Sequence, residues 1–203
     1  MMQYGLRATY YAAFGLMGRD APPNGGFLFE DIKEILEQGH ELGCHTFAHC
    51  DSMKTSPPKF EESILKNKEA LAALVPGATF RTLSYPISVP RLGTKRRASR
   101  FFHCCRGGGQ TFNIGTADQN HLKAFFLEKS RGNPRYVKDI IDRNCSERGW
   151  LIFATHDISE APSPYGCTPS FFEDIVKYSV DSGARIMTVA GALDAISAES
   201  RIE

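Results

Sequence analysis

The sequence predicts an α/β fold built on a parallel sheet. Segments of about 10 to 18 residues with apolar side chains at helical spacing alternate with apolar segments of about five residues. Three helical segments begin with a capping side chain followed by proline, namely Ser56-Pro57, Asn133-Pro134 and Thr168-Pro169. Proline is tolerated at the first helical position because the N–H there has no intrahelical partner. The alternation favours right-handed crossovers and a parallel sheet, open or closed into a barrel.

The first part of the chain is expected to form a strand, a loop, a helix and a second strand. Residues 6–14 are apolar and aromatic without helical spacing, which favours a strand, and residues 22–26 are rich in proline and glycine, which favours a loop. Apolar residues then recur at helical spacing up to Gly39, a residue typical of helix ends. Residues 41–46 are expected to form the next strand, with His45 at its end and His49 in the following loop.

The three proline-started helices are expected to end near Gly77, Gly149 and Gly183. Short strands are expected directly after them, over residues 79–84, 150–154 and 184–189, and a further strand over 101–105. The basic residues 95–97 are interpreted as the solvated face of a helix, and the glycines 107–109 as a flexible loop. Residues 1–203 are expected to form one domain.

Charge and composition exclude several classes of function. The chain has 24 basic and 23 acidic residues, so no charged surface for nucleic acid or an anionic membrane is expected. No apolar segment approaches the ~20 residues that span a bilayer. The six cysteines show no small disulfide framework, which favours free thiols in a reducing compartment and a cytoplasmic location.

His45 and His49 lie four residues apart and are candidate ligands of one metal ion. Two alternatives stay open on the sequence alone. The histidines could be hydrogen-bonded structural residues, or they could share a structural zinc with Cys44 and Cys50. The second alternative is the weaker one, because adjacent residues of a strand such as Cys44 and His45 point to opposite faces.

Three segments resemble one known family. The sequence Gly-His-Glu-Leu-Gly at residues 39–43, followed by His45-Thr46 and His49, resembles the second motif of the polysaccharide deacetylase family, also called the NodB homology domain. Residues 81–86 resemble a variant of its third motif, and residues 151–157 resemble its last motif. The family's first motif, Thr-Phe-Asp-Asp-Gly, has no counterpart here. The resemblance implies an irregular (β/α) barrel of the polysaccharide deacetylase type that lacks its first β/α unit.

The resemblance also implies a metal-assisted hydrolysis. In the family the two histidines of the second motif bind a divalent metal, usually zinc, which assigns metal binding to His45 and His49. The family's third ligand and its general base are the aspartates of the missing first motif. Zinc or another divalent metal is therefore the expected cofactor, bound weakly or not at all without that third ligand.

The other site residues follow from the third and last motifs. His156 matches the family's general acid, and Asp157 beside it is a candidate for orienting it. In the family a tyrosine N–H of the third motif helps to bind the oxyanion. Because Pro86 has no N–H, Tyr85 or an earlier residue is the expected donor. Arg81, Tyr85 and Asp157 are expected to contact the substrate, and Asp118 is a guess for the residue that tunes His156.

The expected function is removal of acetyl groups from an acetylated amino sugar or polysaccharide. The alternative is a catalytically inactive deacetylase-like domain that binds carbohydrate or a partner, because the aspartate pair is absent. The absent first strand also leaves an open sheet edge beside residues 6–14, which predicts self-association into a homo-oligomer.

Overall fold

The computed structural model describes residues 4–18, 27–87 and 89–199. Its strands are β1 (Thr9–Ala12), β2 (Glu41–Cys44), β3 (Thr82–Ser84), β4 (Cys104–Arg106), β5 (Phe125–Phe126) and β6 (Phe153–Ala154). Its α-helices are α1 (Phe29–Glu37), α2 (Pro57–Leu74), α3 (Leu92–Ala98), α4 (Pro134–Ser146), α5 (Pro169–Asp181) and α6 (Val189–Glu199). Two short 3₁₀ helices are η2 (Phe14–Leu16) and η3 (Leu127–Ser130). No helix within these ranges is both long enough and apolar enough to span a bilayer.

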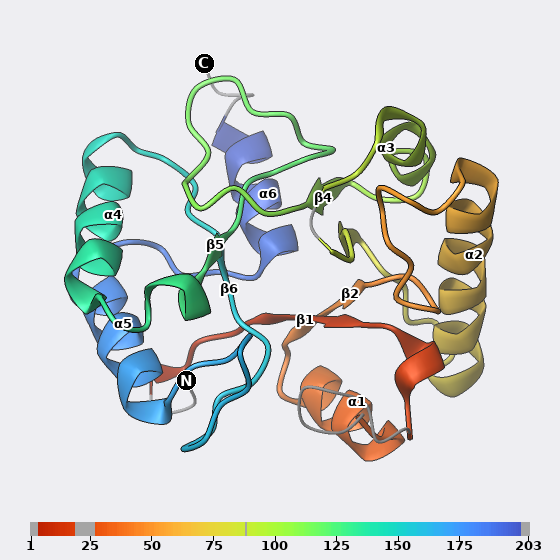
Figure 1. The fold of residues 1–203 in the computed structure, drawn as a ribbon, viewed down its shortest axis with the longest axis horizontal. Helices are drawn as coiled ribbons and strands as arrows, with labels where there is room; N and C mark the ends of the chain where they lie inside the picture. Colours follow the sequence, from red (N-terminus) through yellow and green to blue (C-terminus); the bar gives the residue numbers. More distant parts are fainter. Residues whose placement is uncertain (1–3, 19–26, 88, 200–203) are drawn as a thin grey trace.

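All strand pairs of the sheets are parallel. The strands β1 to β4 are neighbours in chain order, and β5 pairs with β6. A parallel bridge between Arg106 and Leu122 joins the end of β4 to the segment that leads into β5. The strands therefore follow one another across the molecule, with α2 and α3 outside the first four and α4 and α5 outside the last two (Figure 1). Parallel strands present their carboxyl ends on one side, which is where ligands bind in such folds.

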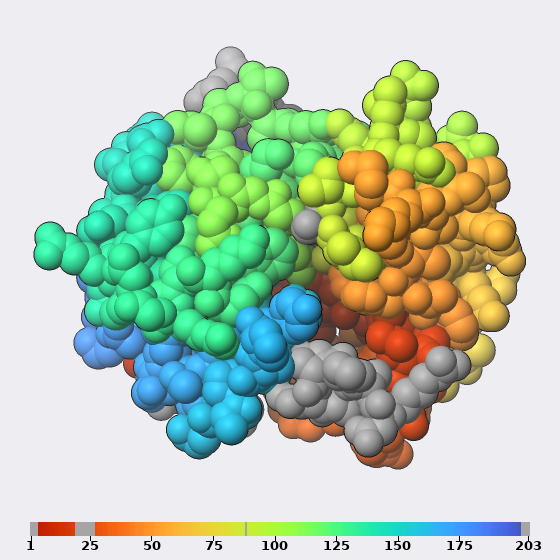
Figure 2. Space-filling view, in the orientation of Figure 1, coloured from red at the N-terminus to blue at the C-terminus, as the bar shows by residue number. Residues whose placement is uncertain are grey.

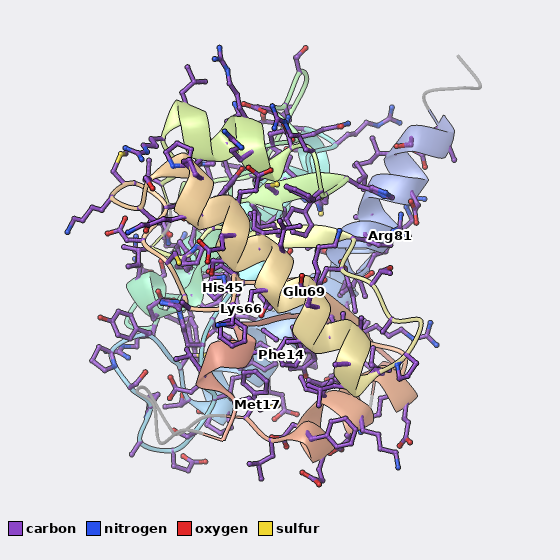
Figure 3. All side chains as sticks on the ribbon, turned by 90° about the vertical axis from the view of Figure 1, so that its right-hand side faces the viewer. Phe14, Met17, His45, Lys66, Glu69 and Arg81 are labelled. Carbon is purple, nitrogen blue, oxygen red and sulfur yellow. The ribbon has the colours of Figure 1, made fainter. Side chains whose placement is uncertain are left out.

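Side chains alternate between the two faces of the sheet. On the outer face, Leu42 and Leu83 pack with Phe60 and Ile64 of α2 in one buried cluster. Figure 3 looks onto α2, which crosses this side of the molecule. A second outer cluster joins β5 to the two helices α4 and α5. On the inner face a third cluster consists of Cys104, Leu122, Ala124, Ile152, Ala154, Val189 and Leu193.

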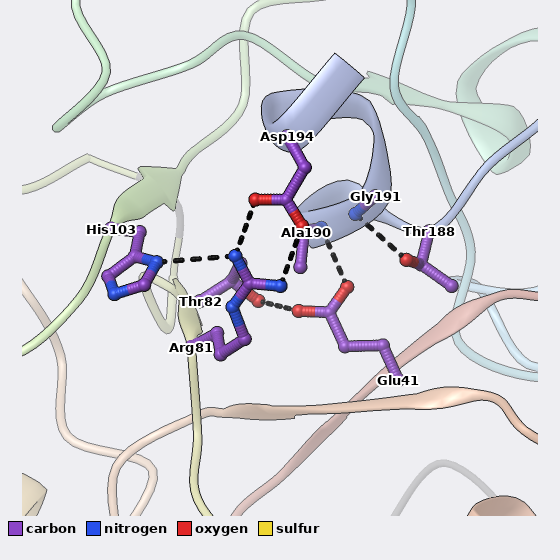
Figure 4. Close-up of polar contacts among 8 residues, drawn as sticks. All are labelled: Glu41, Arg81, Thr82, His103, Thr188, Ala190, Gly191 and Asp194. Atoms are coloured by element: carbon purple, nitrogen blue, oxygen red, sulfur yellow. Dashed lines mark hydrogen bonds and ion pairs between the residues drawn. The ribbon is translucent and has the colours of Figure 1, made fainter. Parts of the chain in front are cut away.

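The carboxylate of Glu41 joins the inner face at the amino ends of the strands. Its two oxygens accept hydrogen bonds from the hydroxyls of Thr9 (2.7 Å) and Thr82 (2.6 Å) and from the backbone N–H of Ala190 (2.9 Å). These donors come from β1, β3 and the first turn of α6. Figure 4 draws Glu41 with two of them, Thr82 and Ala190. One side chain of β2 therefore fixes three other elements.

The predicted α/β class and parallel sheet are confirmed, whereas strand pairing within the described residues does not close a barrel. The three helices begin at Pro57, Pro134 and Pro169, as predicted. The side chains of Asn133 and Thr168 accept the expected capping bonds, at 3.1 and 3.3 Å. Ser56 makes no such bond, so that helix starts on the proline geometry alone.

The strand predicted over residues 184–189 is wrong. Residues 184–188 are irregular, and α6 begins at Val189. The Thr188 hydroxyl accepts a hydrogen bond from the Gly191 N–H (3.1 Å), and the Val189 N–H donates to the Thr9 hydroxyl (2.8 Å). These bonds satisfy free amide groups of the first helical turn, so a helix start replaces the strand.

Other differences concern short elements. The first strand is shorter than predicted, because the 3₁₀ turn η2 begins at Phe14. The strand β5 has two residues and was not predicted. The loop predicted over residues 22–26 lies outside the described residues.

Candidate functional site

The candidate site lies at the carboxyl ends of the strands. His45 directly follows β2, His49 lies in the next loop, and His156 follows β6. The space-filling view shows a hollow near the centre of this face (Figure 2). Atoms of the red segment that contains β1 form its floor, and atoms of the orange segment that follows β2 and of the blue segment that follows β6 lie at its rim.

The ring of His45 is held in one orientation. Its Nδ1 lies 2.7 Å from the carbonyl oxygen of Ser84, and its backbone N–H donates to the carbonyl of Ala12 (3.0 Å). Because a carbonyl can only accept, Nδ1 carries the proton and Nε2 presents its lone pair. Burial, together with the nearby His49 and Arg106, lowers the pKa of His45 to about 3. The imidazole is therefore neutral at pH 7 and able to bind a cation.

A backbone turn with two residues of positive φ places the ring of His49 next to that of His45. Thr46 and His49 both have positive φ, at 56° and 49°. Thr46 is buried, and its hydroxyl accepts a hydrogen bond from the Cys50 N–H at 3.0 Å, which stabilises the turn. The two imidazole rings are 4.8 Å apart between centroids and inclined by 68°. The pKa of His49 is lowered mainly by burial and to a smaller extent by the neighbouring His156.

His156 reaches the same region from the other end of the chain. Its Nδ1 and its backbone N–H both face the carbonyl oxygen of Tyr165, each at 3.3 Å. Its positive form would act electrostatically on both His45 and His49, since it lowers the pKa of each. The structure therefore brings together the three histidines that the sequence singled out.

Tyr85 has a different environment from the one expected. Its side chain is 2% exposed, and its hydroxyl donates to the carbonyl of Asn120 (3.0 Å). Its backbone N–H donates to the carbonyl of Arg106 (2.9 Å) as part of the pairing between β3 and β4. Neither group is free to contact an oxyanion or a substrate, in contrast to the sequence expectation, because the sheet and the core already use both.

Arg81 lies at the other end of the sheet from the histidines. It precedes β3, and its guanidinium binds both carboxylate oxygens of Asp194 in α6, at 2.8 and 2.6 Å (Figure 4). Figure 3 labels Arg81 and His45 and shows Arg81 beside α6, away from His45. We therefore do not propose that Arg81 contacts a substrate at the histidines.

Asp157 and Asp118, the two aspartates predicted for the site, contact a loop and a surface lysine respectively. The carboxylate of Asp157 accepts hydrogen bonds from the backbone N–H (2.9 Å) and hydroxyl of Ser163. Asp157 therefore fixes the loop that carries Tyr165, and that loop in turn faces His156. Asp118 is exposed and forms an ion pair with Lys95.

The residues present fit part of a metal site. His45 and His49 are neutral imidazoles with adjacent rings, and the Nε2 of His45 is free to bind a cation. Within the described residues, no group of three or more His, Cys, Asp and Glu side chains has the geometry to hold a metal ion. Cys44 does not belong to the site, because its sulfur accepts from Asn67 of α2 (3.3 Å) in the outer core. The structure therefore offers no support for the structural zinc alternative.

Sequence reasoning missed Arg106, Tyr11 and Glu128, which lie near the histidines. Arg106 ends β4, and its guanidinium carbon lies 4.8 Å from the ring centroid of Tyr11 and 5.9 Å from that of Phe126. An arginine directly after the strand expected over residues 101–105 was the available signal for this group.

A family model and a curated relative match this sequence. Residues 1–100 match the family model described as polysaccharide deacetylase. A curated relative from Bacillus sp. named gellan lyase is 24% identical over 205 aligned positions, which cover 92% of this chain and 8% of that protein. The chain thus spans a small part of that relative's length.

Solved structures share the fold. The Xyl-CE4 domain of a multidomain xylanase from the hindgut metagenome of Trinervitermes trinervoides has a TM-score of 0.61 at 14% identity, covering 97% of this chain and 80% of that one. The chitin deacetylase of Colletotrichum lindemuthianum has a TM-score of 0.59 at 15% identity, covering 94% and 76%. A mutant of a protein described as a CE4 family pseudoenzyme has a TM-score of 0.58 at 12% identity, covering 94% and 58%. Residues 1–100 of this chain therefore match the polysaccharide deacetylase family, and the chain shares its fold with these solved structures.

Proposed function

We propose that this protein is a metal-dependent hydrolase that removes acetyl groups from an acetylated amino sugar or polysaccharide. The observation that carries the proposal is the convergence of His45, His49 and His156 at the carboxyl ends of the strands. The match of residues 1–100 to the polysaccharide deacetylase family model supports the substrate class. The nature of the bond, an amide or an ester, is part of what the experiment below determines.

His45 and His49 would hold the cation, and His156 would handle the proton. A divalent ion such as zinc, when bound, supplies a Lewis acid and lowers the pKa of water to about 7. His45 contributes a neutral ring whose orientation the Ser84 carbonyl fixes. His156 is exposed and its Nδ1 faces a carbonyl, so its Nε2 is directed away from that contact and can give a proton to the leaving amine or alcohol.

Acetate release from acetylated sugar oligomers tests the proposal directly. We expect the purified protein, loaded with zinc, to release acetate from N-acetylated or O-acetylated oligosaccharides, and the chelated protein to be inactive. The substitutions His45→Gln, His49→Gln and His156→Gln should each remove activity, and the first two should also remove bound metal. His103→Gln is the matched control, because His103 is exposed and contacts Arg81 at the other end of the sheet. No acetate from any oligomer at saturating metal would overturn the proposal.

A catalytically inactive domain that binds carbohydrate or a partner is the second candidate. The observation that favours it is that the described residues contain no third ligand with the geometry for a metal site. In that case the protein should bind acetylated oligosaccharides without releasing acetate, and His45→Gln should leave this binding unchanged. Calorimetric titration of the same oligomers distinguishes the two candidates.

A further inference from the structure

Arg106 is a partly buried cation for which the proposed reaction gives no role. It stands at the end of β4, and its guanidinium faces the rings of Tyr11 from β1 and Phe126 from β5 at 4.8 and 5.9 Å. Burial lowers the pKa of Arg106, although an arginine stays charged at all ordinary pH values. Aromatic faces stabilise such a charge only in part.

This charge lacks a direct counterion within the described ranges. No carboxylate there forms an ion pair with Arg106; the described ion pairs use other residues. Glu128 of η3 is close enough to act on the guanidinium electrostatically, but its Oε2 is buried and makes no hydrogen bond in the described part of the chain. A partly exposed guanidinium without an ion-pair partner among the described residues can accept an anionic ligand.

Arg106 lies beside the strand residue that orients His45. Arg106 is opposite Ser84, whose carbonyl holds the ring of His45, and its charge contributes to the low pKa of His45. The hydroxyl of Tyr11 beside it is also buried and has no hydrogen-bond partner of normal geometry in the described residues. Two donors, one of them cationic, therefore lie together close to His45, and β1 is at the floor of the hollow.

We infer that Arg106 and the Tyr11 hydroxyl form a binding subsite for a carboxylate group next to His45. A guanidinium binds a carboxylate through two parallel hydrogen bonds, and the phenol can add a third. The carboxylate has two sources that share this chemistry, the acetate produced by deacetylation and the uronic acid units of an acidic polysaccharide. This inference rests on the proposed function, because it names a ligand for the proposed active site.

Glu128 makes the inference sharper, because its charge opposes a second carboxylate in the same place. If Arg106 serves only as an internal partner of Glu128, the wild type should bind no carboxylate. If Arg106 is a ligand site, the wild type should bind a carboxylate, and Glu128→Gln should strengthen that binding several-fold. The two possibilities therefore predict different results for the wild type.

Ligand-observed NMR titration of the chelator-treated full chain tests the inference. Acetate and glucuronate are titrated against the neutral compounds acetamide and glucose, so that neither metal nor hydrolysis takes part. We expect a carboxylate to bind more tightly than its neutral counterpart, and Arg106→Gln to weaken that binding about tenfold or more. Arg106→Lys, which keeps the charge but loses the paired geometry, should give an intermediate affinity. Arg185→Gln is the control, since Arg185 is exposed and pairs with Glu199.

The outcomes distinguish the two sources of the carboxylate. They also distinguish a failure of the subsite from a failure of the hydrolytic function. Preferred binding of acetate assigns the subsite to the product, whereas preferred binding of glucuronate assigns it to an acidic polysaccharide. Equal binding of charged and neutral compounds by the wild type, or carboxylate binding unchanged in folded Arg106→Gln or Arg106→Lys, overturns the inference. An active deacetylase with no carboxylate binding would remove only the subsite, and carboxylate binding without acetate release would remove only the hydrolytic function.

Discussion

The Nδ1 of His45 lies 2.7 Å from the carbonyl oxygen of Ser84, which joins the end of β2 to the end of β3. This contact fixes both the tautomer and the direction of the ring, and leaves Nε2 as the free nitrogen. A metal-binding histidine is commonly oriented by such a second hydrogen bond. The backbone of β3 therefore fixes the ring orientation that the proposed metal site requires of His45.

The low pKa of His45 predicts a loss of stability on acidification. In the unfolded chain the imidazole has a pKa near 6.5 and takes up a proton below that value, whereas in the folded chain the pKa is about 3. The unfolded state thus binds more protons between these values, so the free energy of unfolding should fall as the pH drops from 7 toward 3. We expect a loss of about 2 kcal/mol from this residue between pH 7 and pH 5 in metal-free protein.

Urea unfolding of metal-free wild type and His45→Gln at pH 7 and pH 5 measures this loss. The substitution should make the stability less dependent on pH, whereas His103→Gln, an exposed histidine, should leave the dependence unchanged. An identical pH dependence in wild type and His45→Gln would contradict the low pKa.

Gly43 is predicted to be required by the ring of Tyr11. A Cβ added at Gly43 would lie 2.5 Å from two carbon atoms of that ring, in the paired strand β1. Gly43→Ala should therefore force the ring to move and destabilise the fold by about 1–3 kcal/mol. Gly132→Ala is the control, because no atom lies within 4 Å of a Cβ at Gly132 and its φ is not positive. Thermal unfolding of both variants measures the difference, and equal stabilities would show that the ring yields easily.

Glu41→Gln is predicted to loosen the amino ends of the strands. The carboxylate accepts three hydrogen bonds, and an amide at this position loses one acceptor oxygen while adding a donor with no acceptor opposite it. We expect a loss of about 1–3 kcal/mol in the free energy of unfolding. Glu147→Gln should change it by less than about 0.5 kcal/mol, because Glu147 forms an exposed pair with Arg143 on α4. A Glu41→Gln variant as stable as the control would mean that the network adds little.

The outer edge of β1 is predicted to promote self-association. Within the described residues β1 pairs only with β2, so its other edge carries backbone groups that no described strand uses. Such edges pair readily with other chains. Sedimentation velocity should show association that increases with protein concentration, and Tyr10→Lys, a charge at this strand, should weaken it. Leu65→Lys on the exposed face of α2 should not, and a monomer at every concentration would refute the prediction.

The sequence predicted those parts of the fold that depend on local signals. The prolines at 57, 134 and 169 placed three helix starts correctly, since proline geometry acts within a few residues. The strand expected over 184–189 failed because its outcome depends on distant partners. The Val189 N–H binds the hydroxyl of Thr9, a residue 180 positions away, and that contact leaves no pattern in the local sequence.

In the candidate site, too, the sequence predicted what depends on local signals and missed what depends on distant contacts. His45, His49 and His156 follow strands, and the rule that parallel strands end on one side was sufficient to bring them together. Tyr85 was misjudged because the register between β3 and β4 decides that its N–H binds Arg106. Arg106 itself was overlooked because its surroundings, Tyr11 and Phe126, come from two other strands.

Anomalous X-ray scattering from zinc-soaked crystals tests the metal site most directly. We predict one strong zinc peak bound by the Nε2 of His45 and a ring nitrogen of His49, at about 2.0–2.1 Å from each, with His156 close by. The peak should vanish in His45→Gln and persist in His103→Gln. Data collected at saturating zinc with no peak between His45 and His49, or with a peak bound by other residues alone, would contradict the proposed metal site.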